Sequence, residues 1–432
     1  MFKKLRANKK EYSNAARVGW FLALRQIRRG GKGTTTLIVF IMVLTFLNLV
    51  VVSGLLIGLI TGSYGQYRES YSGEVIITTA PGREYIENSQ GLIGFLESHP
   101  WVTSYSPRYS ASAQILGTLD DLPNNKEEAN IIGARLTGLD LAKEEEVTGF
   151  SRFITYGRHL SPYEEGYILI GANLLAKYSS FADANIPGLN FLEDVDVGSR
   201  VRVSVTSGTQ TAKKDFVVAG IIKSKVDEIS TRAFIVDKEL KRLLPVNQEQ
   251  VQEIAVRTDP DKAVPLVAEL KNYMGYSAAR IQTSDEAIPS FLRDIESTMG
   301  ILGNALSSFA LIVAAITIFI VIFINAVTKR KFIGIMKGIG ISPIAIQLSY
   351  IIQAIFYGVA GSTIGLLLTF LVLRPYFDAN PINFPFSDGI LAVTGFGAGV
   401  RVVILMVVTF FAGYLPAKLI VRRNTLDAIL GR

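Results

Sequence analysis

The residue types that carry enzyme chemistry are few and irregularly placed in this sequence. The chain has no cysteine, which excludes disulfides, thiolate nucleophiles and cysteine metal sites. Its two histidines, His99 and His159, lie in unrelated contexts without metal-ligand spacing. The acidic run at residues 144–146 is typical of a solvated surface. We therefore predict no catalytic residue, no metal site and no cofactor.

The glycine-rich stretch from Gly30 to Gly33 resembles a phosphate-binding loop only superficially. That loop needs a Gly-Lys-Ser/Thr ending between a strand and a helix. Here Lys32 is followed by Gly33, and the preceding segment is basic and helical in pattern. The soluble loops also leave no room for an ATPase domain. We predict that the chain is not an enzyme and that any ATP hydrolysis takes place in a partner chain.

A short apolar stripe in a basic loop is the clearest candidate contact site. Ile335, Met336 and Ile339 recur at helical spacing beside lysines, in a segment too short to cross a membrane. Gly338 and Gly340 are expected to end this helix, and Ser342, before a proline, to begin the next. The spacing leaves two interpretations open: a helix that inserts into a partner's groove, or one that touches only lipid.

Long apolar runs flank this loop. The uncharged runs at 34–60, 301–328 and 338–373 exceed the ~20 residues that cross a bilayer core of ~30 Å. A fourth run reaches that length if it includes Arg401 near the interface, where an arginine can extend to the headgroups. We predict a membrane α-helical fold with four transmembrane helices, at 37–61, 301–328, 343–373 and 390–417.

The basic residues cluster beside these runs. Residues 1–36 carry ten Lys/Arg against one acidic residue, the loop 329–342 carries four Lys/Arg and no acid, and the tail 418–432 carries four Lys/Arg and one Asp. Basic flanks stay cytoplasmic, so we predict a multi-pass protein of the inner or cytoplasmic membrane with both termini inside. Membrane topology and attraction to anionic lipid explain this clustered positive charge better than nucleic-acid binding does. Residues 15–29 are expected to form an amphipathic interfacial helix.

The segment 62–300 then forms one large extracytoplasmic domain, and 374–389 a short outer loop. Its pattern predicts a mixed α/β fold. Strands are expected at 74–79, 131–136, 167–170, 197–205, 216–222, 254–257 and 279–282, with a turn at Lys213–Lys214. Helices are expected near 92–96, 172–178 and 261–273, and a stalk helix at about 284–300 runs without a break into the second span.

Two segments carry a family resemblance. Residues 329–342, KRKFIGIMKGIGIS, resemble the loop between the second and third spans of MacB/FtsX/LolC-type (type VII) ABC transporter permeases. Residues 413–418, GYLPAK, and the tail 424–429 resemble that family's closing segment. The order of one helix, a large outer domain and three helices also matches. Two positions depart from the pattern: Phe332 stands where the family has Glu, and Asn424-Thr425 replaces Asp-Pro.

The resemblance implies site residues, partners and a function. The ATPase-coupling residues would be Phe332, Gly334, Ile335, Met336, Lys337, Ile339 and Gly340, and the cytoplasmic C-terminal motif Gly413, Pro416, Ala417 and Lys418. The partners would be an ABC ATPase subunit, a second permease chain and membrane lipid. The outer domain would combine a ferredoxin-like part, about 73–145 and 246–290, with a β-rich insertion.

Under this resemblance the chain is the permease subunit of an ABC transporter that works by mechanotransmission. It couples ATP hydrolysis in a separate subunit to extracytoplasmic work such as export or extraction of lipoproteins, peptides or other small molecules. Two alternatives stay open: an FtsX-like regulator of a cell-wall hydrolase, and, from a different class, a membrane-anchored binding or sensory protein without an ATPase.

Overall fold

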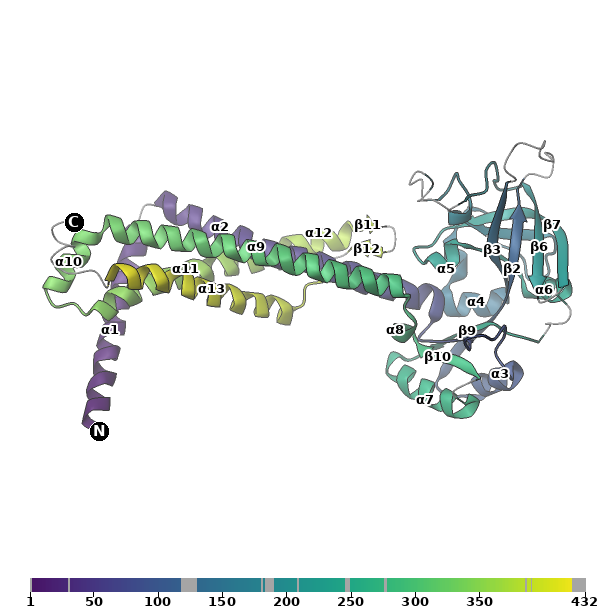
Figure 1. Ribbon diagram of the computed structural model, residues 1–432, viewed down its shortest axis with the longest axis horizontal. Helices are drawn as coiled ribbons and strands as arrows, with labels where there is room; N and C mark the ends of the chain where they lie inside the picture. Colours follow the sequence, from purple (N-terminus) through teal and green to yellow (C-terminus); the bar gives the residue numbers. More distant parts are fainter. Residues whose placement is uncertain are drawn as a thin grey trace. The chain divides into compact units, whose positions relative to one another are not determined.

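The chain divides into two compact units, which are described one at a time. The computed structural model describes residues 2–29, 32–117, 130–179, 182, 190–207, 210–244, 249–275, 278–384, 387–389 and 391–421 (Figure 1). The membrane unit comprises residues 1–60, 294–382 and 389–432, and the outer domain comprises residues 61–293 and 383–388. Within these described residues, four helices are long and apolar enough to cross a membrane, which confirms the membrane part of the predicted fold class.

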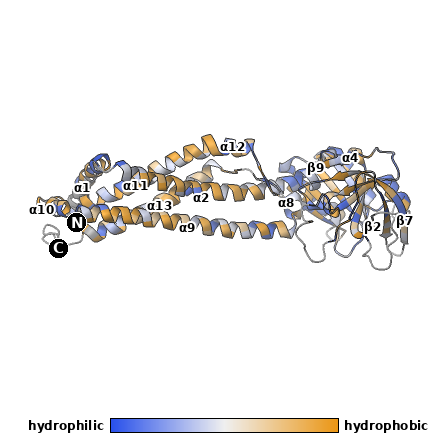
Figure 2. Ribbon diagram, turned by 90° about the horizontal axis from the view of Figure 1, so that it is seen from above, coloured by the Kyte–Doolittle hydropathy of each residue, from blue (hydrophilic) through white to orange (hydrophobic). Residues whose placement is uncertain are grey.

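Apolar residues cover these four helices along most of their length (Figure 2). Each helix extends beyond its predicted span. The span helices are α2 (Lys32–Tyr67), which continues as the π-helical turn η1 (Arg68–Ser72); α9 (Ser290–Thr328); α11 (Pro343–Leu368), which continues through η7 (Thr369–Leu373) into α12 (Arg374–Ala379); and α13 (Gly395–Val421). The third helix therefore occupies part of the expected outer loop, and the fourth is shifted toward the C-terminus.

Glycines permit a close contact between two helices of the membrane unit. A Cβ added at Gly361 of α11 would lie 2.4 Å from Met42 Cβ of α2, and one at Gly365 would lie 2.4 Å from Phe46 Cδ1. Both distances are shorter than real contacts, so α2 and α11 approach at a distance that only glycine permits. Met42 and Phe46 are fully buried there.

The N-terminal helix α1 (Phe2–Arg29) packs on a span as well as facing outward. Gly19 lies against Ala345 and Leu348 of α11, and Gln353 Nε2 donates to Gln26 Oε1 at 3.2 Å. Trp20 and Phe21 remain exposed, as an interfacial helix requires. In the glycine-rich stretch 30–33, residues 30 and 31 lie outside the described residues, and Lys32 and Gly33 begin α2.

The outer domain is built on one large sheet whose strands run in the order β10-β1-β9-β2-β3-β8-β5-β7-β4, with β6 pairing β2 and β7. The strands are β1 (Val75–Thr79), β2 (Val102–Leu116), β3 (Ile131–Leu139), β4 (Ile154–Gly157), β5 (Tyr167–Gly171), β6 (Arg200–Ser207), β7 (Gln210–Ile222), β8 (Arg232–Val236), β9 (Glu253–Thr258) and β10 (Ala279–Thr283). The helical segments are α3 (Ser89–Ser98), α4 (Leu141–Thr148), η2 (Phe150–Phe153), η3 (Ala172–Leu174), α5 (Asp227–Ser230), α6 (Asp237–Leu243), η6 (Pro260–Lys262), α7 (Ala263–Met274) and α8 (Ser284–Ala287).

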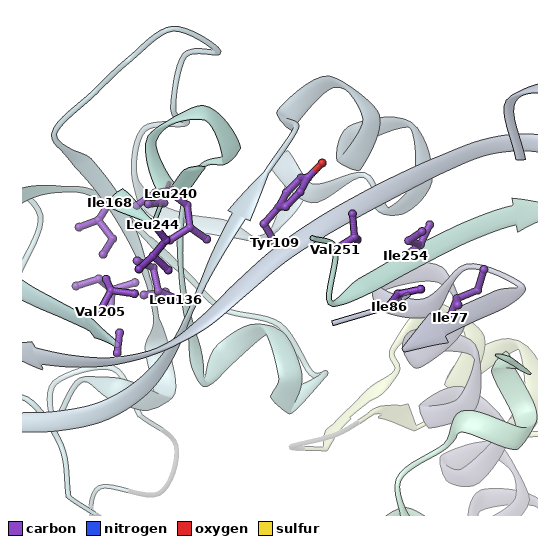
Figure 3. Packing of buried hydrophobic residues seen from close by; sticks show 14 of the residues in the cluster. Ile77, Ile86, Tyr109, Leu136, Ile168, Val205, Leu240, Leu244, Val251 and Ile254 are labelled. Atoms are coloured by element: carbon purple, nitrogen blue, oxygen red, sulfur yellow. The ribbon is translucent and has the colours of Figure 1, made fainter. Parts of the chain in front are cut away.

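The end of the sheet formed by β10, β1, β9 and β2 has the expected ferredoxin-like arrangement. Its neighbouring strands are all antiparallel, and the chain order is β1-α3-β2 followed by β9-α7-β10. Leu92 and Leu96 of α3 and Leu266 and Leu270 of α7 are buried in one core with the strand residues. Figure 3 shows this core continuing from Ile77 and Ile254 to Leu136 of β3 and Val205 of β6, so residues 131–139, which were expected in the ferredoxin-like part, lie beyond its four strands.

Three local expectations are wrong, and one strand was not expected. The helix expected at 172–178 is the single turn η3, and Lys213–Lys214 lies inside β7 rather than in a turn. The fifteen-residue strand β2 was not expected. The stalk is interrupted, because α8 ends at Ala287, Pro289 follows, and α9 begins at Ser290. Proline lacks an N–H and restricts the residue before it, so the helix restarts there.

The loop between the third and fourth spans contributes to the outer domain. Its strands β11 (Ile382–Phe384) and β12 (Ser387–Gly389) form a two-stranded sheet. Lys225 Nζ donates to Asn383 Oδ1 at 2.8 Å, to the Ser387 carbonyl at 3.0 Å and to Asp388 Oδ1 at 2.5 Å. One lysine therefore holds this loop to the segment between β7 and α5.

Candidate coupling and anchoring sites

The loop after the second span folds into the short helix α10 (Arg330–Gly338). Lys329 precedes it, and Gly340 ends it with φ of 91°, a left-handed conformation that favours glycine. Phe332, Ile335 and Ile339 are 69%, 51% and 74% exposed. Their spacing places them on one face, so α10 presents three apolar side chains outward.

The opposite face of α10 packs on its own chain. Ile333 is buried, Gly334 is buried beside it, and Met336 is partly buried against the membrane-unit core. The three residues of the predicted apolar stripe therefore do not share one face of α10. Ile335 and Ile339 face outward, whereas Met336 faces the other helices of the membrane unit. Phe332, at the position where the family carries Glu, completes the outward face.

Lysine 337 links α10 to the end of the fourth span. Its Nζ donates to the Val421 carbonyl at 2.5 Å, at the C-terminal end of α13. The last carbonyls of a helix lack intrahelical donors and carry partial negative charge, so a lysine is a favourable partner. Lys337 thus has a structural contact within the chain.

The C-terminal motif lies within α13. Gly413 packs closely on Ala354 and Ile322, since an added Cβ would lie 2.5 and 3.3 Å from their side chains. Pro416 is inside the helix, Ala417 is fully buried, and Lys418 Nζ lies 5.2 Å from the Tyr414 ring centroid. The expected tail begins at 418, but the helix extends to Val421. Residues 422–432, with the motif at 424–429, lie outside the described residues.

A second site, not expected from the sequence, surrounds η1 at the end of α2. Arginines from the outer domain donate to its last backbone carbonyls. Arg108 Nη2 of β2 donates to the Tyr71 carbonyl at 2.6 Å, and Arg152 and Arg257 donate to the Glu69 carbonyl at 3.3 and 3.4 Å. These cations satisfy carbonyls that the helix itself leaves without donors.

Two carboxylates balance the arginines in this buried network. Arg108 makes a two-pronged contact with Glu144, through Nε at 2.9 Å and Nη2 at 2.7 Å, and Nη1 donates to Glu253 Oε1 at 2.5 Å. Arg232 Nη2 donates to the Tyr71 hydroxyl at 2.6 Å, which donates to Glu253 Oε2 at 2.7 Å. We call Tyr71, Arg108, Glu144, Arg232 and Glu253 the arginine hub.

The hub holds its charges in the interior. Arg108, Glu144 and Glu253 are only 2%, 2% and 3% exposed. Burial by itself raises the pKa of Glu253. The charges of Arg232 and Arg108 and the hydrogen bonds from Tyr71 and Arg108 outweigh it and lower that pKa to about 2. Burial likewise lowers the pKa of Arg108, but Glu144 and Glu253 raise it above its ordinary value.

This hub has only a weak signal in the sequence. Arg108, Arg232 and Glu253 are charged residues within strands, and Arg232 begins a strand that is otherwise apolar. The interpretation of residues 144–146 as a solvated surface is wrong for Glu144. Which charges meet depends on strands far apart in the chain, and single-sequence patterns do not report that.

The histidines have local partners. His99 Nε2 lies 2.8 Å from Glu269 Oε2, and His159 Nδ1 lies 2.8 Å from the Leu160 carbonyl. Within the residues that the structure describes, no group of three or more His, Asp or Glu side chains is placed to hold a metal ion.

Comparison with known proteins identifies the membrane unit. Residues 304–425 match a family model described as FtsX-like permease C-terminal. The chain is 25% identical over 242 residues to ABC transporter permease YtrF of Bacillus subtilis, covering 51% of this chain and 53% of that protein. It is 21% identical over 253 residues to the uncharacterized ABC transporter permease MJ1507 of Methanocaldococcus jannaschii, covering 56% and 59%. The matched region thus spans little more than half the length of these curated relatives.

Two solved structures are similar to parts of the chain. The periplasmic region of MacB from Actinobacillus actinomycetemcomitans is 16% identical, with a TM-score of 0.33, over 50% of this chain and 91% of that one. The extracellular domain of the noncanonic ABC-type transporter YknZ from Gram-positive bacteria is 14% identical, with a TM-score of 0.30, over 48% and 98%. The matched region at residues 304–425, the two permease relatives and the four spans around a mixed α/β domain support an ABC transporter permease of the MacB/FtsX type.

Proposed function

We propose that the chain is the membrane subunit of an ABC complex that couples ATP hydrolysis in a separate ATPase chain to work outside the cytoplasm. The observation that carries the proposal is the outward apolar face of α10, formed by Phe332, Ile335 and Ile339. On a loop flanked by lysine and arginine, such a face suits insertion into a partner's groove. Burying each side chain there would contribute roughly 1.5–3 kcal/mol.

The arginine hub supports a mechanical role for the first span. The helix α2 continues into η1, and the hub holds the carbonyl and the hydroxyl of Tyr71. A helix end held by buried charge-assisted hydrogen bonds does not move separately from its surroundings. Motion of the first span would therefore reach the outer domain through η1, which is what mechanotransmission requires.

The proposal includes topology and assembly. The basic residues on 1–36, 329–342 and 418–432 favour cytoplasmic termini, with the outer domain across the membrane. The helix α9 exposes apolar side chains along its length, among them Ile301, Phe309 and Ile316. A second permease chain and lipid would cover this face. The work done outside would be export or extraction of lipoproteins, peptides or other small molecules.

Charge placed on the outward face of α10 tests the ATPase contact. The double variant Phe332→Asp/Ile339→Asp puts two carboxylates where an apolar groove is expected, and an unpaired buried charge costs several kcal/mol. We expect at least about a tenfold loss of ATP-hydrolysing activity that co-purifies with the tagged chain at equal membrane levels, since about 1.4 kcal/mol is tenfold in affinity.

The matched control is Phe21→Asp, which makes the same change at a phenylalanine that is 60% exposed on α1. It should keep the co-purifying activity. Full retention by Phe332→Asp/Ile339→Asp would show that the face meets only lipid, and loss in both variants would show a general effect of acidic residues near the membrane.

A further inference from the structure

The strand β10 ends the sheet of the outer domain on one side. It pairs antiparallel with β1 from Val75↔Thr283 to Thr79↔Ala279. In the described part of the chain, no strand pairs with its other edge. A free strand edge presents backbone donors and acceptors in a row and can accept a further strand.

The hydrogen bonds at the end of β10 identify the outward groups. Ser284 N donates inward to the Glu74 carbonyl at 2.9 Å, whereas Thr283 N donates to the Glu286 carboxylate at 3.3 Å. Along an antiparallel strand the bonding direction alternates with each residue. The N–H and C=O groups of Ala279 and Ile281 therefore point to the open edge, as Thr283 N does.

A basic groove follows this edge. It has a volume of about 500 Å³ and is lined by β10 residues with Lys271 of α7, Glu286 of α8 and Arg293 of α9. Its charged side chains are Lys271, Arg280 and Arg293 against the single carboxylate of Glu286. That carboxylate already closes the capping box with Thr283. Among the described residues, neither Lys271 nor Arg280 has a carboxylate partner.

We propose that β10 binds an extended acidic segment of a partner protein as an additional strand. The outward backbone groups of Ala279 and Ile281 would supply the ladder hydrogen bonds, and Lys271, Arg280 and Arg293 would select acidic side chains. Because side chains alternate between faces, the segment should carry acidic residues at every second position on the Arg280 side. A phosphate or lipid headgroup would use the cations alone and leave the strand edge unused.

The proposal does not depend on ATPase coupling, and it is tested on the full chain in detergent. The probe is a fluorescent seven-residue peptide of alternating valine and glutamate, measured by anisotropy. Two peptide controls separate the contributions: one is N-methylated at the amides that would face β10, and one carries lysine in place of glutamate. Each should bind at least about tenfold more weakly, since the first loses ladder donors and the second meets like charge.

Variants of the chain locate the site. Arg280→Glu, on the exposed face of β10, should weaken binding of the acidic peptide by about fivefold or more. Arg83→Glu changes an arginine that is 61% exposed elsewhere on the domain, and it should leave this binding unchanged. Hydrogen exchange should slow at Ala279 and Ile281 when the peptide is bound. Both variants should keep the wild-type melting temperature.

Three outcomes would overturn the proposal. Equal binding of the N-methylated peptide would show an anion site without strand addition. If the lysine peptide bound as tightly as the glutamate peptide, the site would not select acidic side chains. If no peptide bound at millimolar concentration, or if hydrogen exchange at Ala279 and Ile281 did not change, β10 would not accept a further strand. Arg280 would then only prevent other strands from pairing with this edge.

Discussion

At the scale of single residues, Arg108 is the point on which the polar contacts around η1 converge. Its guanidinium donates four hydrogen bonds, two to Glu144, one to Glu253 and one to the Tyr71 carbonyl. Arginine suits this position because its planar fork serves a two-pronged carboxylate contact and a carbonyl together. Exposed pairs in the same domain, such as Arg202 with Asp215, involve side chains that are nearly half exposed and are screened by solvent.

Removing Arg108 should therefore destabilise the outer domain strongly. Arg108→Met leaves Glu144 and Glu253 buried without their main partner, at a cost of about 3–5 kcal/mol. Arg202→Met, at the exposed pair, should cost at most about 1 kcal/mol. Urea unfolding followed by Trp101 fluorescence, in a Trp20→Phe background, measures both. A cost for Arg108→Met as small as that of Arg202→Met would show that the hub does not hold η1.

The low pKa of Glu253 predicts a pH dependence. The folded pKa lies near 2, below the ordinary value of 4.5, so the contribution of Glu253 is present above about pH 4.5 and is lost as the pH falls toward 2. Glu253→Gln should be less stable than wild type at pH 7, and this difference should narrow between pH 5 and about pH 2. The test is the midpoint of urea unfolding, followed by Trp101 fluorescence, measured for both proteins across this pH range. A constant difference would mean that the Glu253 charge is not what stabilises the hub.

At the scale of elements, two features control how helices begin and approach. Pro289 separates α8 from α9, so the second span starts at Ser290 with its own first turn. Gly361 and Gly365 bring α11 against Met42 and Phe46 of α2. The contact at Gly361 involves a backbone atom of Met42 at 3.0 Å, which cannot move aside as the end of a side chain can.

Adding one methyl group at Gly361 should separate these helices. Gly361→Ala should lower the stability of the membrane unit by about 1–3 kcal/mol through overpacking, although alanine is the better helix former. Gly300→Ala in α9 is the matched control, because an added Cβ there has no atom within 4 Å. It should be neutral or stabilising. The measurement is the fraction of each variant that remains monodisperse after heating in detergent. Equal heat resistance of the two variants would contradict the tight α2–α11 contact.

At the scale of the whole molecule, the chain forms two units with separate hydrophobic cores. The outer-domain core runs from β10 and α7 through β2 to β5 and β7, all within residues 75–281. The membrane-unit core is formed by α2, α9, α10, α11 and α13 with residues 391 and 393. Each unit therefore buries its apolar residues without using the other's core.

A fragment containing residues 62–298 should fold alone. It holds the whole outer-domain core and the arginine hub, and a domain of this size can bury enough surface to be stable. We expect a soluble protein with a cooperative thermal transition. The matched control Arg108→Met should lower that transition in the fragment as it does in the full chain. Aggregation of the wild-type fragment, or a transition without cooperativity, would show that the spans are needed for folding.

The ferredoxin-like end of the sheet was expected from the family resemblance, whereas the amino-acid sequence by itself determined the four spans, the mixed outer domain and the apolar helix in the basic loop. These follow from hydropathy, charge and periodicity within windows of about twenty residues or less, which act locally. Only the tertiary structure decided that Met336 faces the bundle while Phe332 faces outward, and that Glu144 is buried with Arg108. It also decided that Lys225 holds the loop of Asn383 and Asp388, and that β10 is a free edge. These features depend on which distant strands and helices become neighbours, and no local pattern records that pairing.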